Sequence, residues 1–322
     1  LQVAADETTT LSNGGQTPLH QLQTGITLRR EDGESADANA LQQAQQQLVR
    51  LLDGVHKPAI LDATGARLEQ QIEALATPLQ RAQAQSDLQA FTQLVAQGQR
   101  QTLLDPFNGR RYPAAYEYAD PSVGVGLMQH ELATAKSVQD YQKADDDILT
   151  LTANLHALLA DLRDPTAYNK AHKTDLSLLQ RDQLLGGKVV VVSLAEQVAR
   201  FYDGGKLVHS SYVTTGRIEL PSPPGIHYAM TKNSPVLFTS PEPRNSPLWF
   251  EPTPVQYAIA YAAGGDFLHD AWWRNQFGPG TQLPHYDPAA FNGGSHGCVN
   301  FPRQQMQWVY DWTQVGTPVL VY

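Results

Sequence analysis

Residues 188–206 read KVVVVSLAEQVARFYDGGK, and this stretch decides the fold of the second half of the chain. A run rich in β-branched valine is followed by a second apolar run that ends at Tyr202. Asp203 to Lys206 then carry the signal of a turn, and residues 207–214 continue as a third strand. Strand, turn and strand in this order predict a β-hairpin, because glycine permits the tight reversal between antiparallel strands.

From this hairpin to the end of the chain, short apolar runs alternate with loops rich in proline and glycine. Residues 303–313 predict one short helix, and residues 319–322 predict a closing strand. This pattern indicates a mostly β domain, which we place at residues 183–322.

Residues 36–182 have a different pattern, which predicts a helical spacer domain. Apolar residues recur there at steps of three and four, so that they share one face of a helix. The two stripes are Leu68, Ile72, Leu75 and Leu79, and then Ile148, Leu151, Leu155, Leu158, Leu159 and Leu162. We predict a helical hairpin or bundle, an α+β fold class for the whole chain, and a catalytic half that stays folded when residues 1–180 are deleted.

Two other segments of the first half lack such a stripe. Residues 101–135 are rich in proline and glycine, which predicts a long connection. Residues 1–35 are polar, which predicts a flexible leader. The chain begins with Leu1, and we interpret it as a trimmed form whose export signal or membrane anchor is missing.

The composition bounds the class of protein. The chain has 322 residues, of which 41% are hydrophobic and 17% are charged, as in a globular protein. Its formal net charge of -9 argues against nucleic acid as a partner, because such proteins usually present a basic face. We predict no cofactor.

The only cysteine, Cys298, lies in the unusual segment GSHGCVN at residues 294–300. A thiol attacks as thiolate and therefore needs a base, for which the chain offers His227, His269, His285 and His296. Gly297 before the cysteine permits a sharp turn whose N–H groups could stabilise an oxyanion. Together these features indicate acyl transfer. The alternatives are a buried structural cysteine and a zinc site formed by Cys298 with His269, His285 and His296. The spacing of these residues matches no metal motif, so we predict no metal.

The segment SHGCVN at residues 295–300 resembles the Ser/Thr-His-Gly-Cys-x-Asn signature of L,D-transpeptidases with the YkuD fold. FLHDA at residues 267–271 resembles the upstream strand of that family, which ends in histidine. Residues 188–202, Thr215-Gly216 and residues 223–227 are similar to its opening hairpin and to two further landmarks. The resemblance covers about residues 186–322.

The resemblance implies a peptidoglycan L,D-transpeptidase with Cys298 as its nucleophile. The thiolate would attack the third residue of a tetrapeptide stem, release the terminal D-amino acid and form a thioester. An amine from a second stem would then complete a 3→3 cross-link. His269 would be the base, oriented by the carbonyl or the carboxylate of Asp270, and His285 is its rival because the His269–Ser295 spacing is longer than in the family.

Other site residues follow from the same resemblance. The N–H groups of Gly297 and Cys298 would form the oxyanion hole. Ser295, His296 and Asn300 would shape the turn and contact the substrate, with His296 either structural or active in proton transfer. Trp272, Trp273 and Arg274 lie in a stretch that is longer here than in the family. The tryptophans could line a substrate groove or simply be core residues, and Tyr257 is a further candidate for substrate contact. Arg274 would pair with a stem carboxylate, and residues 232–257 lie where the family has a lid.

The implied partners are donor and acceptor stem peptides and carbapenem-type inhibitors, and the implied location is extracytoplasmic, in the cell envelope. An L,D-carboxypeptidase or amide hydrolase with the same Cys/His site is the alternative. A non-enzymatic wall-binding protein is a third possibility.

Overall fold

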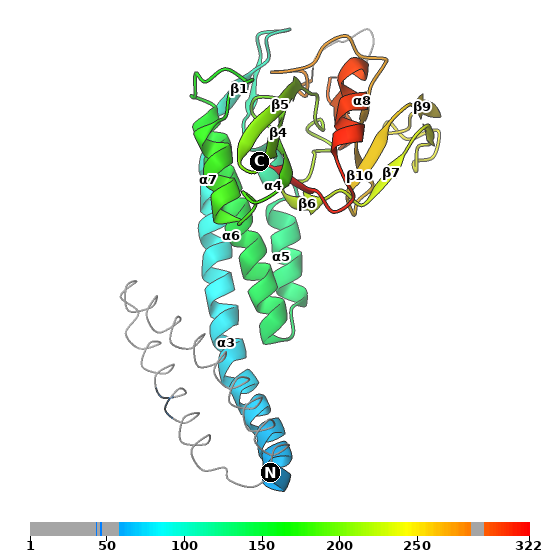
Figure 1. The fold of residues 1–322 in the computed structure, drawn as a ribbon. Helices are drawn as coiled ribbons and strands as arrows, with labels where there is room; N and C mark the ends of the chain where they lie inside the picture. The colour runs from blue at the N-terminus through cyan, green and yellow to red at the C-terminus, as the bar shows by residue number, and fades with distance from the viewer. Residues whose placement is uncertain (1–42, 44–45, 47–57, 285–292) are drawn as a thin grey trace. The chain divides into compact units, whose positions relative to one another are not determined.

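The structure is a computed structural model, and it describes residues 43, 46, 58–284 and 293–322 (Figure 1). The chain divides into two compact units, Leu1–Gln85 with Ala135–Lys143 and Ser86–Thr134 with Ala144–Tyr322. The predicted leader at residues 1–35 lies outside the described residues. No helix in the described part of the chain combines the length and the apolar character needed to cross a membrane.

The first unit contains the beginning of two long helices, α3 (Pro58–Gly98) and α6 (Val138–Asp161). Reciprocal bonds cap the start of α6. The Ser137 N–H donates to the Asp140 carboxylate at 2.9 Å, and the Asp140 N–H donates to the Ser137 hydroxyl at 3.1 Å. This arrangement pairs backbone groups that the first turn of a helix leaves open.

The second unit is built on a five-stranded sheet with the strand order β5-β4-β3-β13-β6. Strand β13 runs parallel to β3, and the other neighbours are antiparallel. The strands are β3 (Lys188–Ser193), β4 (Val198–Asp203), β5 (Lys206–Tyr212), β6 (Gly225–Tyr228) and β13 (Pro318–Val321). The predicted hairpin and closing strand are therefore present.

A four-stranded sheet, in the order β12-β11-β10-β7, carries the region of the cysteine. Its strands are β7 (Thr231–Asn233), β10 (Ala258–Ala262), β11 (Asp266–Asp270) and β12 (Val299–Phe301). Strand β12 pairs in parallel with β11, whereas β10 pairs antiparallel with both β11 and β7. A separate hairpin joins β8 (Val236–Phe238) to β9 (Thr253–Val255).

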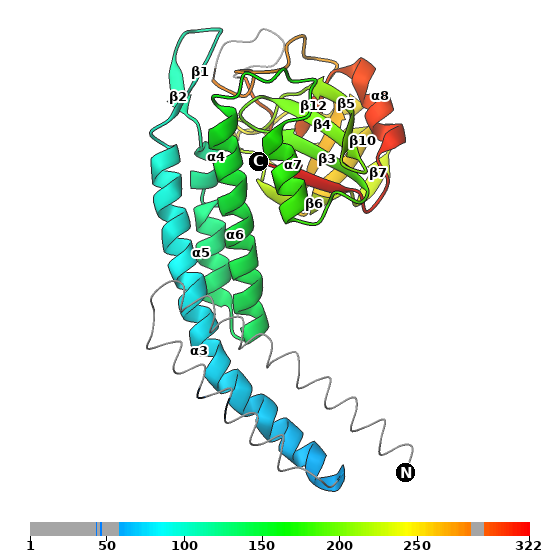
Figure 2. The same cartoon turned by 60° about the vertical axis from the view of Figure 1, so that its left-hand side comes forward.

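Helices cover both faces of the five-stranded sheet, as alternate residues of β4 show (Figure 2). Arg200 and Tyr202 bond to Asp175 of α7 (Lys173–Arg181). Phe201 points to the other face, where its ring contacts Trp308 of α8 (Arg303–Trp312) at 5.2 Å. Because successive side chains of a strand face opposite sides, α7 and α8 lie on opposite faces. The helix predicted at residues 303–313 is thus confirmed.

Helix α6 shares its core with the sheet. Four residues of its apolar stripe, Ile148, Leu151, Leu155 and Leu158, are buried, and the other two are partly buried. The Asn154 side chain donates to the Val321 carbonyl of β13 at 3.1 Å. The members of this common cluster include Phe91, Val95, Ile148, Leu151, Leu155, Leu158, Val190, Val191, Phe201 and Val321. A deletion of residues 1–180 would expose this apolar surface, which weighs against the expectation that the remainder folds alone. The domain boundaries at residues 35 and 182 stay predictions.

The prediction of a long connection at residues 101–135 is wrong. The segment holds the hairpin β1 (Thr102–Leu104) and β2 (Arg111–Pro113), and the helices α4 (Tyr116–Ala119) and α5 (Val125–Thr134). Two of its glycines serve close packing, since a Cβ on Gly124 would lie 2.1 Å from the Tyr118 carbonyl oxygen and one on Gly126 would lie 2.4 Å from the Pro121 carbonyl oxygen. The α+β class, with helices before a β-rich domain, is confirmed.

Candidate active site

Two parallel strands bring the cysteine and a histidine to the same side of the four-stranded sheet. In the pairing of β11 with β12, Leu268 lies opposite Val299 and His269 opposite Asn300. One step earlier, the Phe267 N–H donates to the Cys298 sulfur at 3.4 Å. Paired residues project to one face and successive residues alternate, so Cys298 and His269 share a face of the sheet. They lie on neighbouring strands, one diagonal step apart.

The backbone fixes the protonation pattern of His269. Its Nδ1 lies 2.9 Å from the carbonyl oxygen of Asp270, which can only accept a hydrogen bond. Nδ1 therefore carries the proton, and Nε2 presents a lone pair. The ring is almost fully buried and contacts the rings of Phe238 at 5.0 Å and Trp273 at 5.8 Å. Burial lowers the pKa of His269 to about 4, which keeps the imidazole neutral at pH 7.

The cysteine is held as a neutral thiol. Burial, and then the neighbouring Asp266 carboxylate, raise the pKa of Cys298 to about 12 against the opposing bond from Phe267. The residue as a whole is of intermediate exposure. The shifts at Cys298 and His269 both favour thiol plus imidazole over a thiolate–imidazolium ion pair. Proton transfer would therefore accompany substrate attack instead of preceding it.

The turn before the cysteine is closed by hydroxyl groups. The Ser295 hydroxyl donates to the Cys298 carbonyl at 2.5 Å and accepts from the Gly297 N–H at 3.2 Å. The Ser222 hydroxyl donates to the Gly297 carbonyl at 2.5 Å and accepts from the Gly216 N–H at 2.9 Å. These bonds anchor the turn on both sides, as expected for a loop that must present a reactive side chain.

Asp266 is a neighbour of the cysteine that sequence reasoning missed. Gly297 has a φ of 106°, and a Cβ at this position would lie 2.3 Å from the Asp266 carboxylate. Only glycine therefore fits, both for its backbone conformation and for this close approach. Burial raises the pKa of Asp266 to about 6. In the sequence, the one hint that Asp266 belongs to the site is its position three residues before His269. Its approach to Gly297 depends on the parallel pairing of β11 with β12, which the sequence does not show.

Replacement of Asp266 by asparagine is expected to lower the pKa of Cys298 by about one unit, because the amide removes a negative charge that opposes the thiolate. The difference applies above about pH 6, where Asp266 is ionised. The measurement is the midpoint of the pH profile for alkylation of the single cysteine by iodoacetamide. Asp311→Asn, on the exposed side of α8, serves as the control. A midpoint that stays in place, or moves up, would contradict this effect.

His296 lies at the surface next to the cysteine. A guanidinium nitrogen of Arg217 lies 3.2 Å from its Nε2, and the Phe250 ring contacts it at 5.2 Å. An arginine only donates, so Nε2 accepts this bond. Desolvation, followed by the positive charge of Arg217, lowers the pKa of His296 to about 4. The segment predicted to act as a lid thus touches both histidines, through Phe238 and Phe250, while its role as a lid stays a prediction.

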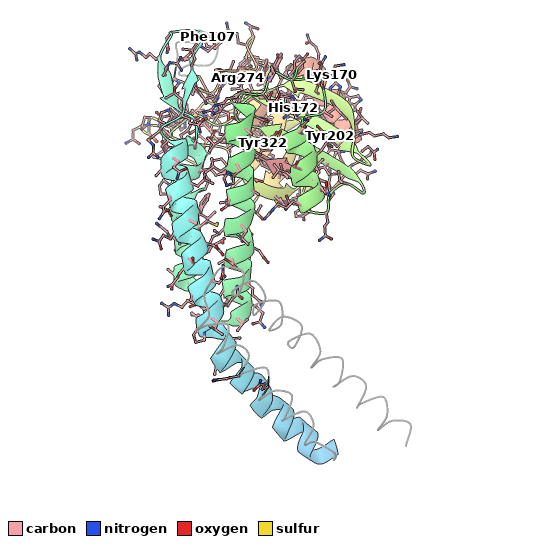
Figure 3. All side chains as sticks on the ribbon, turned by 90° about the vertical axis from the view of Figure 1, so that its left-hand side faces the viewer. Phe107, Lys170, His172, Tyr202, Arg274 and Tyr322 are labelled. Carbon is pink, nitrogen blue, oxygen red and sulfur yellow. The ribbon has the colours of Figure 1, made fainter. Side chains whose placement is uncertain are left out.

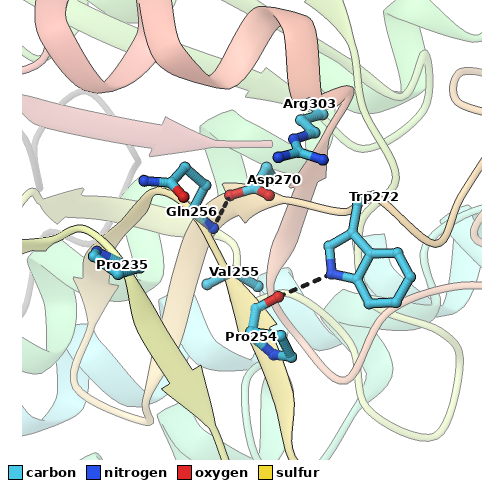
Figure 4. Close-up of a pocket in the computed structure, with 7 residues that line it drawn as sticks. All are labelled: Pro235, Pro254, Val255, Gln256, Asp270, Trp272 and Arg303. Carbon is cyan, nitrogen blue, oxygen red and sulfur yellow. Dashed lines mark hydrogen bonds between the residues drawn. The ribbon is translucent and has the colours of Figure 1, made fainter.

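The carboxylate of Asp270 does not orient His269. It accepts the N–H groups of Gln256 at 2.8 Å and Tyr257 at 2.7 Å, and its other oxygen has no hydrogen-bond partner among the described residues. Of the two groups of Asp270 that were considered, the backbone carbonyl is the one that lies within hydrogen-bond distance of His269 Nδ1. Because it neighbours His269 on the strand, the Asp270 side chain faces the other side of the sheet. There it lines a pocket of about 240 Å³ with Trp272 and Arg303 (Figure 4).

The other predicted substrate residues lie in different surroundings. Tyr257 packs on Tyr310 of α8, with ring centroids 5.0 Å apart, and its part in substrate binding stays a prediction. Trp272 is 52% exposed and donates to the Pro254 carbonyl, so it is not a core residue, whereas Trp273 contacts His269. Figure 4 shows Trp272 at the edge of the Asp270 pocket.

Arg274 and Asn300 lie closer to the reacting groups. Arg274 is buried, donates to the Gly293 carbonyl and contributes to the lowered pKa values of His269 and His296. Asn300 lies opposite His269 in the strand pairing, and its side-chain oxygen has no hydrogen-bond partner within the described part of the chain. His285, the rival base, lies outside the described residues.

The second half of the chain is similar to one family of known proteins. Residues 187–321 match the model of the YkuD family, described as the L,D-transpeptidase catalytic domain. Probable L,D-transpeptidase 3 of Mycobacterium tuberculosis is 28% identical over 109 residues, which are 33% of this chain and 36% of that protein. L,D-transpeptidase 1 of the same organism is 25% identical over 143 residues, or 44% and 51%. The chain thus matches between about a third and a half of these relatives.

Among solved structures, an L,D-transpeptidase from Mycobacterium smegmatis is 25% identical, with a TM-score of 0.35 and coverage of 42% of this chain and 58% of that one. The L,D-transpeptidase LdtMt1 in complex with imipenem is 24% identical, with a TM-score of 0.36 and coverage of 42% and 59%. The family match spans both strands that carry Cys298 and His269. The similarity to the YkuD family of L,D-transpeptidase catalytic domains is thus confined to residues 187–321 of this chain.

Proposed function

We propose that this protein is a peptidoglycan L,D-transpeptidase that forms 3→3 cross-links through a thioester on Cys298. One observation carries the proposal most directly. Cys298 and His269 lie on one face of paired parallel strands, and the Asp270 carbonyl holds His269 with a free lone pair on Nε2. A nucleophile, a base and an orienting group are the parts that acyl transfer by cysteine requires.

In acylation, the Cys298 sulfur bonds to the carbonyl carbon of the third stem residue while His269 Nε2 takes the thiol proton. The amide bond to the terminal D-amino acid then breaks, and the proton leaves with the new amine. In the second half, an acceptor amine attacks the thioester, the carbon–sulfur bond breaks and the thiol is restored. The neutral pair in the resting state suits this cycle, because a thiol without substrate is protected from side reactions.

The N–H groups of Gly297 and Cys298 are the proposed oxyanion hole. The Gly297 N–H makes only a long bond to Ser295, at 3.2 Å, so an oxyanion could replace that partner. A charged acceptor forms a stronger bond than a hydroxyl, which favours this exchange in the tetrahedral intermediate. Asn300 is paired with His269 across the strands and Trp273 contacts its ring, so both are proposed substrate contacts. The positive charge of Arg274 is proposed to attract a carboxylate of the stem peptide.

The family match supports stem peptides as donor and acceptor, and an extracytoplasmic location at the cell wall. Carbapenems are proposed inhibitors on the same ground, because a strained lactam carbonyl would acylate Cys298 as the stem carbonyl does. Tethering to the membrane or wall is a separate proposal.

A product analysis tests the reaction. The protein is incubated with a tetrapeptide stem, with and without a second stem as acceptor, and the products are identified by mass spectrometry. We expect release of the terminal D-amino acid and a cross-linked dimer only when the acceptor is present. A tripeptide as the main product under both conditions would instead indicate an L,D-carboxypeptidase. An unchanged stem under both conditions would favour a wall-binding protein without activity.

A further inference from the structure

A second group of ligand-type side chains converges where the helices meet the five-stranded sheet. Asp161 ends α6, Asp164 follows in the next loop, and His172 directly precedes α7. Within residues 58–284 and 293–322, these three form the one group of acidic, histidine or cysteine side chains with metal-binding geometry. Their ligand atoms all lie within 4.8 Å of one another. None of them belongs to the site around Cys298.

The orientation of His172 is the second observation, and it is independent of the acidic cluster. His172 is fully buried, and its Nε2 lies 3.4 Å from the Ala167 carbonyl, which accepts the proton on that nitrogen. Nδ1 then presents a lone pair, and it has no hydrogen-bond partner among the described residues. This lone pair points at the carboxylates of Asp164 and Glu196, each 3.6 Å away. Figure 3 labels His172 in this region together with Tyr202 and Tyr322.

The distance between His172 and Asp164 distinguishes an ion pair of protonated His172 from a pair of ligands that share one metal ion. A distance of 3.6 Å is too long for a hydrogen bond from an imidazolium to a carboxylate. Two ligands that bind one metal at about 2.1 Å in a tetrahedron lie about 3.4 Å apart. The His172–Asp164 separation therefore matches two ligands of one ion. A lone pair facing two carboxylates without a cation between them would be repulsive in a buried site.

The surrounding charges and bonds favour a cation. Asp161, Asp164, Asp175 and Glu196 gather around Arg200, whose guanidinium bonds directly to Asp175 and Glu196. One positive charge thus faces four carboxylates. Asp161 is held in place by hydroxyl donors, from Thr174 at 2.7 Å and Tyr322 at 2.8 Å. Hydrogen bonds of this kind commonly orient the side chains that bind a metal. The bond from His172 Nε2 to the Ala167 carbonyl is another example.

We propose that Asp161, Asp164 and His172 bind one divalent transition-metal cation of the zinc class. An imidazole nitrogen with two carboxylate oxygens is a ligand set that favours such an ion over magnesium or calcium, which prefer oxygen alone. The ion would join the end of α6 to the start of α7, and Glu196 places the β3–β4 turn beside it. Its role is to fasten the helices to the sheet of the catalytic domain.

The test is a titration of untagged, EDTA-treated protein with Zn²⁺, followed by calorimetry and by metal analysis after dialysis. The protein carries Cys298→Ala, so that the thiol cannot supply a competing site. We expect one equivalent of zinc per chain and a melting temperature that rises with the zinc concentration. We expect Mg²⁺ to bind at least 100-fold more weakly.

Two variants and a matched control assign the site. Asp164→Asn is expected to weaken zinc binding at least tenfold, and it should fold, because its side-chain oxygen still accepts the Thr166 N–H. His172→Gln is expected to do the same and to change the visible spectrum of bound Co²⁺. Asp120→Asn is the control, since Asp120 accepts the Ser122 N–H in an equivalent turn outside the cluster. It should bind zinc like the parent.

The outcomes separate the proposal from an ion pair of protonated His172. A parent protein that binds no zinc overturns the proposal, and so does binding that is equal in the parent and in the folded Asp164→Asn and His172→Gln variants. Loss of binding in both variants, with binding retained in Asp120→Asn, supports it. Because the readout is metal content and melting temperature, the result does not depend on transpeptidase activity.

Discussion

Replacement of Cys298 by alanine is expected to abolish formation of a covalent adduct with a carbapenem, while the chain stays folded. The sulfur is the atom that would bond to the lactam carbonyl, and the chain has no second cysteine to substitute for it. The structural cost is small, since alanine keeps the Cβ atom and the hydrogen bond that the sulfur accepts from the Phe267 N–H is long at 3.4 Å. We expect a loss of stability of about 1 kcal/mol.

The measurement is intact mass after incubation with imipenem, for the wild type and the variant. The wild type should gain the mass of one inhibitor, and the variant should gain none. Circular dichroism and the melting temperature provide the control that the variant is folded. Cys298→Ser is a second control, because its hydroxyl can still accept the Phe267 N–H. An adduct of equal yield on Cys298→Ala would exclude this cysteine as the nucleophile.

Replacement of His269 by alanine is expected to slow acylation by about 10²–10⁴-fold, the usual contribution of a general base. The thiol has a raised pKa, so its proton has to be removed during attack, and Nε2 of His269 is the free lone pair on the same face. The rate of adduct formation under single-turnover conditions is the measurement. His209→Ala is the matched control, since this histidine also packs on aromatic rings, those of Phe201 and Trp308, but is not among the proposed site residues.

The pH dependence gives a further check on this assignment. A base acts only when it is neutral, and burial lowers the pKa of His269 to about 4. The wild-type rate should therefore fall only as the pH drops through about 4, and no loss is expected between pH 7 and pH 5. If His285→Ala slows acylation by this factor and His269→Ala does not, the base is His285 and our assignment is wrong. The melting temperature of His269→Ala must be recorded too, because the ring packs on Phe238 and Trp273.

Local patterns were sufficient for much of the fold. The hairpin at residues 188–214, the helix near residues 303–313 and the closing strand were predicted because alternating and three-to-four-residue periods determine which face of an element is apolar. The stripe from Ile148 to Leu162 was predicted for the same reason. A period does not say what the apolar face packs against. The stripe was assigned to a separate helical bundle, whereas the structure packs it on the β-sheet core.

Some residues of the candidate site could be predicted from the sequence, whereas others were found only in the structure. Cys298, the turn around it and His269 were predicted from short motifs, since each motif is a run of adjacent residues. The close approach of the Asp266 carboxylate to Gly297 was missed, and so was the packing of Tyr257 on Tyr310. Both depend on which strand lies next to which, and no run of adjacent residues records that.

The class of the β-rich domain, its proposed nucleophile and the histidine proposed as its base could all be predicted from the amino-acid sequence. Only the tertiary structure decided which carbonyl holds that histidine, which carboxylate opposes the thiolate and which helices share the core of the sheet. The reason is physical. Motifs and periods are properties of neighbouring residues, whereas burial and charge at a site come from pairings such as that of Asn154 with Val321, 167 residues apart in the chain.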